Sequence, residues 1–242
     1  MDVISHMTKL QFQIDPVSSA PSAENAPLHV ELRDLVIAGW AGRDASAIEH
    51  HIVELEQLGV PRPSAVPLFY RVAANQLTQS DALQVVGADS SGEVEAFIFS
   101  HDGQVYVSVA SDHTDRQLET HSVAHSKQVC VKPVAAHAWR LDEVIDHWDQ
   151  LLIRSWIEEE GARVLYQEGT LAGLRTPGDL IGRCFGESTA RRIPDGVGML
   201  CGTVPAIGGI RPSRVFEMEI EDPVLKRTIR HQYRCEELPI VS

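Results

Sequence analysis

The sequence of 242 residues predicts an α+β fold in which strands predominate. Its apolar residues fall mostly into short runs with the period-two alternation of strands, bounded by turn-forming residues. A few longer stretches carry the three-to-four-residue spacing of helices. These stretches do not alternate regularly with the strands, and no segment repeats, so a doubly wound parallel sheet is not expected. The length fits one domain as the default.

The N-terminal part is predicted to hold two strands around a surface loop. The strands are LQFQI (10–14) and HVELRDLVIAGW (29–40), and the Pro/Ser/Ala-rich segment between them covers 16–27. We treat residues 1–34 as an N-terminal unit whose first six residues resemble a tag remnant, and 35–242 as the main domain.

Three helices are expected further along the chain. Residues 44–58 carry an apolar stripe, with Ser46 and Glu49 as a capping box and a glycine and a proline at the end. A second helix is predicted to run from about 115 to 126. The segment 141–161, LDEVIDHWDQLLIRSWIEEEG, has the longest helical pattern and ends in a glycine.

A hairpin is predicted in EVEAFIFSHDGQVYVSVASD (93–112). If Asp102–Gly103 is a two-residue turn, paired positions sum to 205, which places Glu93 opposite Asp112. Three more strand segments follow at the C-terminal end: 198–212, 214–223 and 227–238.

Composition excludes several classes of function. Lys and Arg number 21 against 34 Asp and Glu, a formal charge of -13, so nucleic acid and anionic membranes are not expected partners. No apolar run reaches the roughly 18 residues of a membrane span. The four cysteines are widely spaced and form no CxxC pair, which favours a reducing compartment and predicts a cytoplasmic protein.

Two groups of acids occur at alternate strand positions. Glu93 and Glu95 share a side with two phenylalanines, while the opposite side is also apolar, so neither side is freely solvated. With Asp112 across the hairpin, three carboxylates form an oxygen-rich cluster suited to Mg2+ or Mn2+. Alternatively, these acids rim a hairpin in solvent. The acids of 217–221 alternate with an apolar side, and we interpret them as an ordinary solvated strand face.

A histidine and a glutamate lie one turn apart on the 44–58 helix. His51 and Glu54 share a face at the border of the apolar stripe. A half-buried imidazole beside a carboxylate suits a general base. The spacing alone favours a boundary histidine with a surface partner.

Four motifs, in this order, resemble the fumarylacetoacetate hydrolase superfamily from about residue 35 to the C-terminus. They are similar to the family's H-x-x-E helix with its following loop, its E-x-E strand, its N-D-x-S-A-R-D-x-Q segment and its GTP-x-G-x-G loop. The matching segments are AGWAGRDASAIEHHIVELEQLGVPRPSAVPLFYRV, EVE, SDHTDRQLE and GMLCGTVPAIGGIRPSRVFEMEI. The pattern is also similar to a branch of that superfamily known as DUF2848.

The resemblance implies a mixed β-sandwich or β-roll of the fumarylacetoacetate hydrolase C-terminal-domain type with flanking helices, usually a homodimer. Residues 35–242 would be the catalytic domain. Glu93, Glu95 and Asp112 would bind Mg2+ or Mn2+, with Ca2+ as a further option. The metal would chelate a 2-oxo carboxylate or a 1,3-dicarbonyl and stabilise an enolate.

The resemblance also implies roles for residues outside the metal ligands. His51, oriented by Glu54, would activate a water. Arg116 would meet the substrate, and Thr203 would contact its carboxylate.

Several positions depart from the family pattern. Arg71 stands where the family has the substrate-binding lysine of F-x-K, and Gln117 and Glu119 replace an aspartate and a glutamine. The active-site lysine has two candidates: the spacing from the metal ligand favours Lys132, whereas the local pattern favours Lys127, which we take.

The sequence is compatible with three hypotheses for function. The first is a metal-dependent hydrolase of a small carbonyl-containing carboxylate. The second keeps the fold and metal but decarboxylates, isomerises or hydrates an oxo acid. The third is a noncatalytic small-molecule binding protein.

Overall fold

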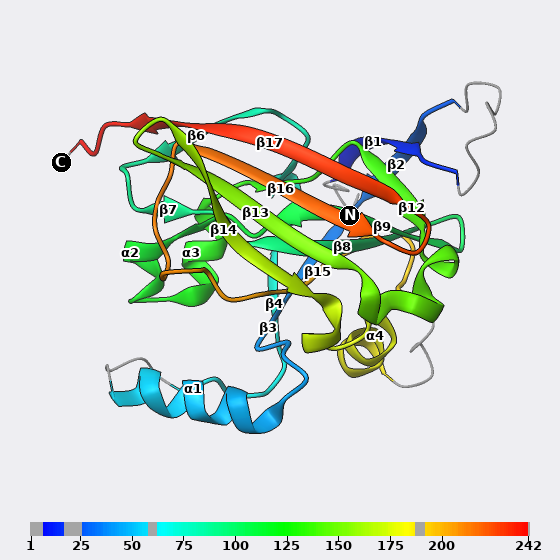
Figure 1. The fold of residues 1–242 in the computed structure, drawn as a ribbon, viewed down its shortest axis with the longest axis horizontal. Helices are drawn as coiled ribbons and strands as arrows, with labels where there is room; N and C mark the ends of the chain where they lie inside the picture. The colour runs from blue at the N-terminus through cyan, green and yellow to red at the C-terminus, as the bar shows by residue number, and fades with distance from the viewer. Residues whose placement is uncertain (1–6, 17–25, 58–61, 187–191, 242) are drawn as a thin grey trace, which may run out of the picture.

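The computed structural model describes residues 7–16, 26–57, 62–186 and 192–241, and within these ranges it consists of two large sheets and short helices (Figure 1). The α+β class dominated by strands is confirmed. The eight strands of the larger sheet are, in spatial order, β2 (Leu28–Leu32), β1 (Thr8–Ile14), β12 (His137–Arg140), β9 (Gln104–Ser111), β8 (Val94–His101), β15 (Val197–Thr203), β3 (Asp34–Gly39) and β4 (Leu68–Ala73).

The second sheet has five strands and lies in front of the first in Figure 1. Its strands are, in order, β14 (Ala162–Thr170), β13 (Leu152–Glu159), β16 (Val215–Asp222), β17 (Arg227–Leu238) and β6 (Ala82–Val86). Two short pairs complete the strands: β10 (Thr114–Asp115) with β7 (Ser90–Ser91), and β11 (Lys132–Pro133) with β5 (Leu77–Thr78).

The helices are short and peripheral. They are α1 (Ala45–Gln57), α2 (Arg116–Glu119), α3 (Val123–Val129) and α4 (Pro177–Phe185), with 3-10 turns at Ala74–Gln76, Leu141–Glu143, Ile145–Gln150 and Leu171–Gly173. Figure 1 shows α1 apart from the two sheets. No helix in the described ranges is long and apolar enough to cross a membrane.

The larger sheet separates two apolar cores. Between the sheets, Val94, Ala96 and Ile98 of β8 belong to one buried cluster with residues of β13, β16 and β17. On the other face, Phe97 and Phe99 belong to a second cluster with β1 and β3. Both sides of β8 are therefore buried, as its sequence predicts, and acids on this strand lie next to apolar side chains.

The predicted register of the β8–β9 hairpin is confirmed. His101 pairs with Gln104 and Val94 with Ser111, so paired positions sum to 205. Asp102 and Gly103 have φ of 49° and 73°, the two positive values that a type I′ turn requires. The turn therefore determines which side chains meet at the far end of the hairpin.

Two helix predictions need correction in their details. The 44–58 helix is present as α1, but Asp44 rather than Ser46 caps it, because the Asp44 carboxylate accepts the amides of Ser46 and Ala47 at 2.9 and 3.1 Å. The predicted 115–126 helix is two helices. Asp115 caps α2 and Ser122 caps α3, so a second cap interrupts the pattern.

The predicted helix over 141–161 is wrong. Its first part forms two 3-10 turns, and Leu152–Glu159 is β13. Along β13 the side chains alternate, with Ile153 and Ile157 buried and Arg154 half-buried. Because β13 pairs with β14 on one side and β16 on the other, sheet pairing prevails over the local helical spacing.

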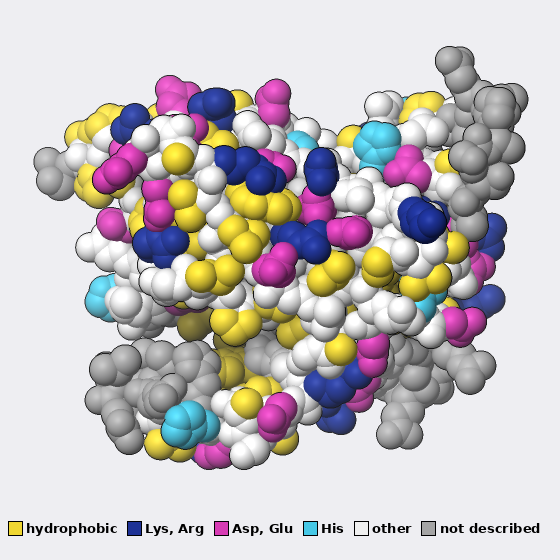
Figure 2. All heavy atoms as spheres, viewed as in Figure 1, with side chains coloured by type: hydrophobic (Ala, Val, Ile, Leu, Met, Phe, Trp, Pro, Cys, Tyr) yellow, Lys and Arg dark blue, Asp and Glu magenta, His cyan; other side chains and the backbone are white. Residues whose placement is uncertain are grey.

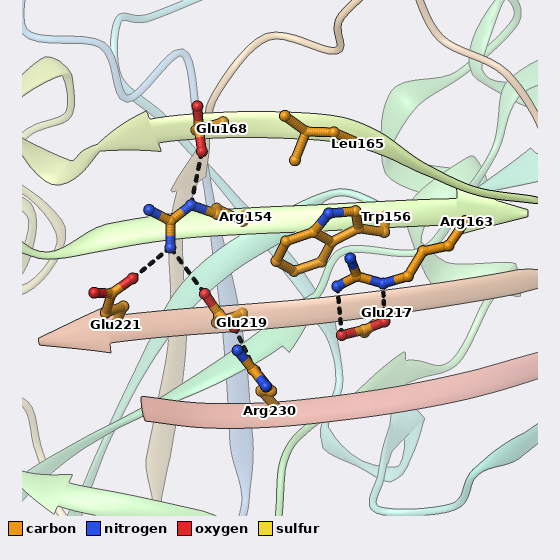
Figure 3. A pocket seen from close by; sticks show the side chains of 9 residues that line it. All are labelled: Arg154, Trp156, Arg163, Leu165, Glu168, Glu217, Glu219, Glu221 and Arg230. Carbon is orange, nitrogen blue, oxygen red and sulfur yellow. Dashed lines mark hydrogen bonds and ion pairs between the residues drawn. The ribbon is translucent and has the colours of Figure 1, made fainter. Parts of the chain in front are cut away.

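The interpretation of 217–221 as an ordinary solvated face is also wrong for Glu219, which is 2% exposed. Arg154 of β13 and Arg230 of β17 are its cross-strand neighbours, and both donate to its carboxylate. Glu217 accepts from Arg163 at 2.7 Å. Figure 2 shows acidic and basic side chains mixed on this outer face, and Figure 3 shows the ion pairs that join the strands of the sheet.

This network is expected to stabilise the second sheet. Arg154→Met removes a donor from the buried Glu219 carboxylate, so the free energy of unfolding should fall by about 2 kcal/mol. Urea denaturation measures this change. Arg230→Met is the matched comparison, because Arg230 is more exposed and should cost less. An equal loss of stability in the two variants, or no loss in either, would contradict the stabilising role of the Arg154–Glu219 ion pair.

Candidate metal centre

The three predicted metal ligands meet at the open end of the β8–β9 hairpin. The amide of Asp112 donates to the carbonyl of Glu93 at 3.0 Å, which continues the ladder beyond the strands. One carboxylate oxygen from each of Glu93, Glu95 and Asp112 lies within 4.8 Å of the others. Glu95 is 3% and Asp112 1% exposed, so these acids do not rim a solvated hairpin.

Glu95 is held by a β-bulge in the neighbouring strand. The register between β8 and β15 shifts between Leu200 and Thr203, and there the amide of Gly202 donates to Glu95 Oε2 at 2.7 Å. Burial, with Asp112 and Glu93 nearby, raises the pKa of Glu95 well above its ordinary value. Within the described ranges, no basic side chain forms a hydrogen bond or ion pair with Glu95.

Gly202 is required at this bulge. Its φ is +93°, and a Cβ there would lie 2.6 Å from the Cβ of Ala41. Gly202→Ala should lower the free energy of unfolding by about 2 kcal/mol and weaken Mn2+ binding about tenfold, because the amide that orients Glu95 must move.

Denaturation and Mn2+ titration of Gly202→Ala measure these two effects. Gly173→Ala is the matched control, since a Cβ at Gly173 meets nothing within 4 Å. A Gly202→Ala protein with the stability and Mn2+ affinity of the Gly173→Ala protein would contradict the role of the bulge.

Asp112 lies between two buried lysines. Lys127 of α3 donates to Asp112 Oδ2, and Lys132 of β11 lies 3.1 Å from Oδ1 and also donates to the His113 carbonyl. Burial alone would raise the pKa of Asp112, but the two ammonium groups outweigh it and the pKa is lowered. Asp112 is thus ionised, with an ammonium group beside each of its two oxygens.

The two candidate lysines differ in how many N–H donors of the ammonium group remain free. Lys132 is 0% exposed, and its ammonium is shared between Asp112 and a backbone carbonyl. Lys127 is 6% exposed, meets Asp112 as its one acceptor in the described ranges, and lies 5.7 Å from the centre of the Tyr70 ring. Lys127 therefore keeps more donors for a bound molecule.

Arg116 begins α2 and lies beside Glu93. Its Nη2 is 3.4 Å from Glu93 Oε1, Nη1 donates to Glu119 at 2.9 Å, and Nε donates to Ser91 at 2.7 Å. Nη2 is buried and has no hydrogen-bond partner in the described part of the chain. Glu119, which departs from the family pattern, thus holds the arginine predicted to meet substrate.

Thr203 lies at the end of β15, next to the bulge. Its hydroxyl donates to the Val94 carbonyl at 2.7 Å and accepts from Gln167 at 2.8 Å. The hydroxyl proton is thus donated to the carbonyl of the residue between the two glutamates of the E-x-E segment, and it is not free for a bound molecule.

The structure does not bring Arg71 to the cluster. Arg71 is paired with Val36 on β3, which faces the core between the sheets, and its side chain forms an exposed ion pair with Asp34. The neighbouring Tyr70 packs instead with the core that lies on the Glu95 side of the sheet. Strand alternation therefore points residue 71 away from the carboxylates.

The other predicted catalytic pair is described only in part. His51 and Glu54 lie on α1 as expected, but the positions of their side chains fall outside what the structure describes. The proposed tag remnant, and most of the loop at 16–27, also fall outside the described residues.

Sequence reasoning missed a buried polar group behind the carboxylates. His113 shares hydrogen bonds with Tyr233 at 3.0 Å and Ser90 at 2.9 Å, and the Tyr233 hydroxyl also meets Ser111 at 2.9 Å. Burial, with Lys132 nearby, lowers the pKa of His113 to about 3. His113 is therefore a neutral structural group, and its partners come from distant segments that no local pattern connects.

The donor set fits a hard divalent cation. Three carboxylates converge, and carboxylate oxygens are the ligands that Mg2+, Mn2+ and Ca2+ prefer. The Glu95 carboxylate is buried and, in the described ranges, no basic side chain forms a hydrogen bond or ion pair with it, so a cation would supply positive charge in direct contact.

The family assignment follows from a match to a family model described as a protein of unknown function (DUF2848), which covers residues 38–233. The chain belongs to the DUF2848 family. Its fold is that of the fumarylacetoacetate hydrolase superfamily, as the resemblance predicts. No curated protein sequence matches this one.

Several solved structures share this fold at low sequence identity. The protein Cg1458 with inhibitor has a TM-score of 0.61 at 14% identity, covering 97% of this DUF2848 chain and 90% of its own. A 2-keto-3-deoxy-D-arabinonate dehydratase complexed with magnesium and 2,5-dioxopentanoate has a TM-score of 0.59 at 15% identity, covering 93% and 80%.

Proposed function

We propose that this DUF2848 protein is a divalent-metal-dependent enzyme that acts on a small 2-oxo carboxylate. The convergence of Glu93, Glu95 and Asp112 in a buried position carries the proposal. Mg2+ or Mn2+ is the proposed cofactor. When bound, the metal would polarise the 2-oxo and carboxylate oxygens and stabilise the negative charge that develops when a neighbouring proton is removed.

The cations around the cluster suit an anionic substrate. Lys127 has donors left after its bond to Asp112, and we assign it to an oxygen on which negative charge develops. Arg116 is the proposed partner of a second anionic or polar group, through the Nη2 atom that has no hydrogen-bond partner in the described ranges. Thr203 is better suited to holding the Glu93–Glu95 segment than to donating its hydroxyl to substrate.

Dehydration of a 2-oxo acid with a hydroxyl at C4 is our preferred reaction, ahead of hydrolysis. A dehydratase of a 2-keto-3-deoxy acid, complexed with magnesium and an oxo acid, shares the fold, which supports this choice. In such a reaction a base takes the C3 proton and the electron pair forms a C3–C4 double bond. The C4–O bond breaks, and the hydroxyl leaves with a proton as water.

His51, oriented by Glu54, is the proposed base. Among the described side chains around the cluster, the three carboxylates are assigned to metal, and His113 has both ring nitrogens bonded and a low pKa. In the hydrolytic alternative His51 would instead activate a water for attack on a distal carbonyl.

An assay with purified protein and defined substrates tests the proposal. The panel holds 2-keto-3-deoxy sugar acids and acylpyruvates, each with Mg2+, with Mn2+ and with EDTA, and NMR identifies the products. We expect EDTA-sensitive loss of water from a 2-keto-3-deoxy acid. Cleavage of acylpyruvates alone would favour the hydrolase, and turnover that is insensitive to EDTA would overturn metal dependence.

A further inference from the structure

Gln167 lies behind the carboxylate cluster and outside every motif of the family pattern. It is in the middle of β14 in the five-stranded sheet and is 1% exposed. Its side chain crosses from that sheet to the larger one, where Val94 and Thr203 lie. A buried amide that joins the two sheets at the metal ligands must be fully bonded to be stable.

All four hydrogen-bonding positions of the Gln167 amide are used. Its Oε1 accepts from the Val94 amide at 3.0 Å and the Ser155 hydroxyl at 2.8 Å. Its Nε2 donates to the Thr203 hydroxyl at 2.8 Å and the Val204 carbonyl at 2.6 Å. The orientation is unambiguous, because a backbone amide can only donate and a backbone carbonyl can only accept.

These bonds close a ring around the E-x-E segment. Val94 separates Glu93 from Glu95, and its amide donates to Gln167 while its carbonyl accepts from Thr203. The Thr203 hydroxyl in turn accepts from Gln167. The peptide groups on both sides of Val94 are thus fixed, and these groups set the directions of the two glutamate side chains.

The geometry points to Gln167 as a positioning residue for the metal centre, which it orients through Val94 and Thr203 without touching metal or substrate. This inference rests on the proposed metal-dependent function. It assigns to one amide the preorganisation of Glu93 and Glu95, so the loss of that amide should weaken metal binding beyond its effect on stability.

Mn2+ titration by calorimetry of the full chain tests the inference, with electron paramagnetic resonance of free Mn2+ as a second readout. Gln167→Met keeps the length of the side chain and removes all its bonds, and Thr203→Val opens the ring at its other member. We expect each to weaken Mn2+ binding at least about tenfold. If Gln167→Met does not fold, Gln167→Glu replaces it, because glutamate keeps the acceptor for the Val94 amide but loses the two N–H donors. The Mn2+ affinities of Gln167→Glu and Thr203→Val then test the inference.

Ser155→Ala is the matched control. The Ser155 hydroxyl is 0% exposed and donates to the same Gln167 oxygen, but it lies outside the ring. Ser155→Ala should lower the Tm yet keep Mn2+ affinity within about twofold of the parent.

Three outcomes would overturn the inference. Parental Mn2+ affinity in the folded Gln167 and Thr203 variants would overturn the positioning role of Gln167, while the proposed metal centre would stand. Equal weakening in Ser155→Ala would reduce Gln167 to a structural role. A parent protein that binds no Mn2+ would overturn the proposed metal centre and this inference together.

Discussion

Replacement of Glu95 with glutamine should weaken Mn2+ binding at least about 100-fold and abolish measurable turnover, because a direct ligand matters more than the partners that orient it. The Gly202 amide can still donate to the new side-chain oxygen, so the bulge should persist. The expected loss is therefore of one anionic ligand, with the surrounding backbone unchanged.

The same variant should be more stable than the parent when metal is absent. The folded-state pKa of Glu95 is raised above its ordinary value of 4.5, so the protonated carboxyl group favours folding at low pH. This contribution to stability is lost as the pH rises through the folded-state pKa and the group ionises. Glutamine removes that dependence. The stability advantage of Glu95→Gln should thus be absent below pH about 4.5 and grow toward neutrality.

Calorimetric Mn2+ titration and pH-dependent denaturation with EDTA measure these two effects. Glu217→Gln is the control for loss of a strand carboxylate, since Glu217 lies on the outer face and pairs with Arg163. It should leave Mn2+ affinity unchanged. Parental Mn2+ affinity in Glu95→Gln would contradict the assignment of Glu95 as a ligand.

The two lysines on Asp112 should respond differently to substitution. Lys132→Met leaves a buried carbonyl and part of a buried carboxylate without a donor, so the free energy of unfolding should fall by about 3 kcal/mol. Lys127→Met should cost less, because Lys132 and a bound metal still neutralise Asp112. With saturating Mn2+, however, Lys127→Met should lower kcat by about 100-fold or more, as loss of a charge-stabilising donor does.

Denaturation with and without Mn2+, together with kcat at saturating substrate, separates the two lysines. The roles assigned to the two lysines would be reversed if Lys127→Met were active while Lys132→Met had parental stability but no activity.

The meeting of Glu93, Glu95 and Asp112 can be predicted from the sequence because one local rule determines it. A two-residue Asp-Gly turn has few geometries, so the register of the whole hairpin and the meeting of Glu93 with Asp112 follow from residues 102 and 103. The burial of Glu95 can likewise be predicted from the sequence, because apolar residues occupy both sides of its strand.

Other features depend on partners that are distant in sequence. Residues 141–161 have helical spacing, but pairing with β14 and β16 makes their second half a strand. The motif position of Arg71 predicts a substrate contact, but the direction of its side chain depends on the register between β3 and β4. Gln167 carries no local signal, because its four bonds reach Val94, Ser155 and the end of β15.

A crystal structure with Mn2+ and oxalate, solved with anomalous data at the manganese edge, tests whether the three carboxylates bind one metal ion. We expect one anomalous peak between the three carboxylates, about 2.0–2.2 Å from an oxygen of each of Glu93, Glu95 and Asp112. Oxalate should complete the coordination and lie within reach of Lys127. A peak elsewhere, or no peak at saturating Mn2+, would show that these carboxylates are not the metal ligands.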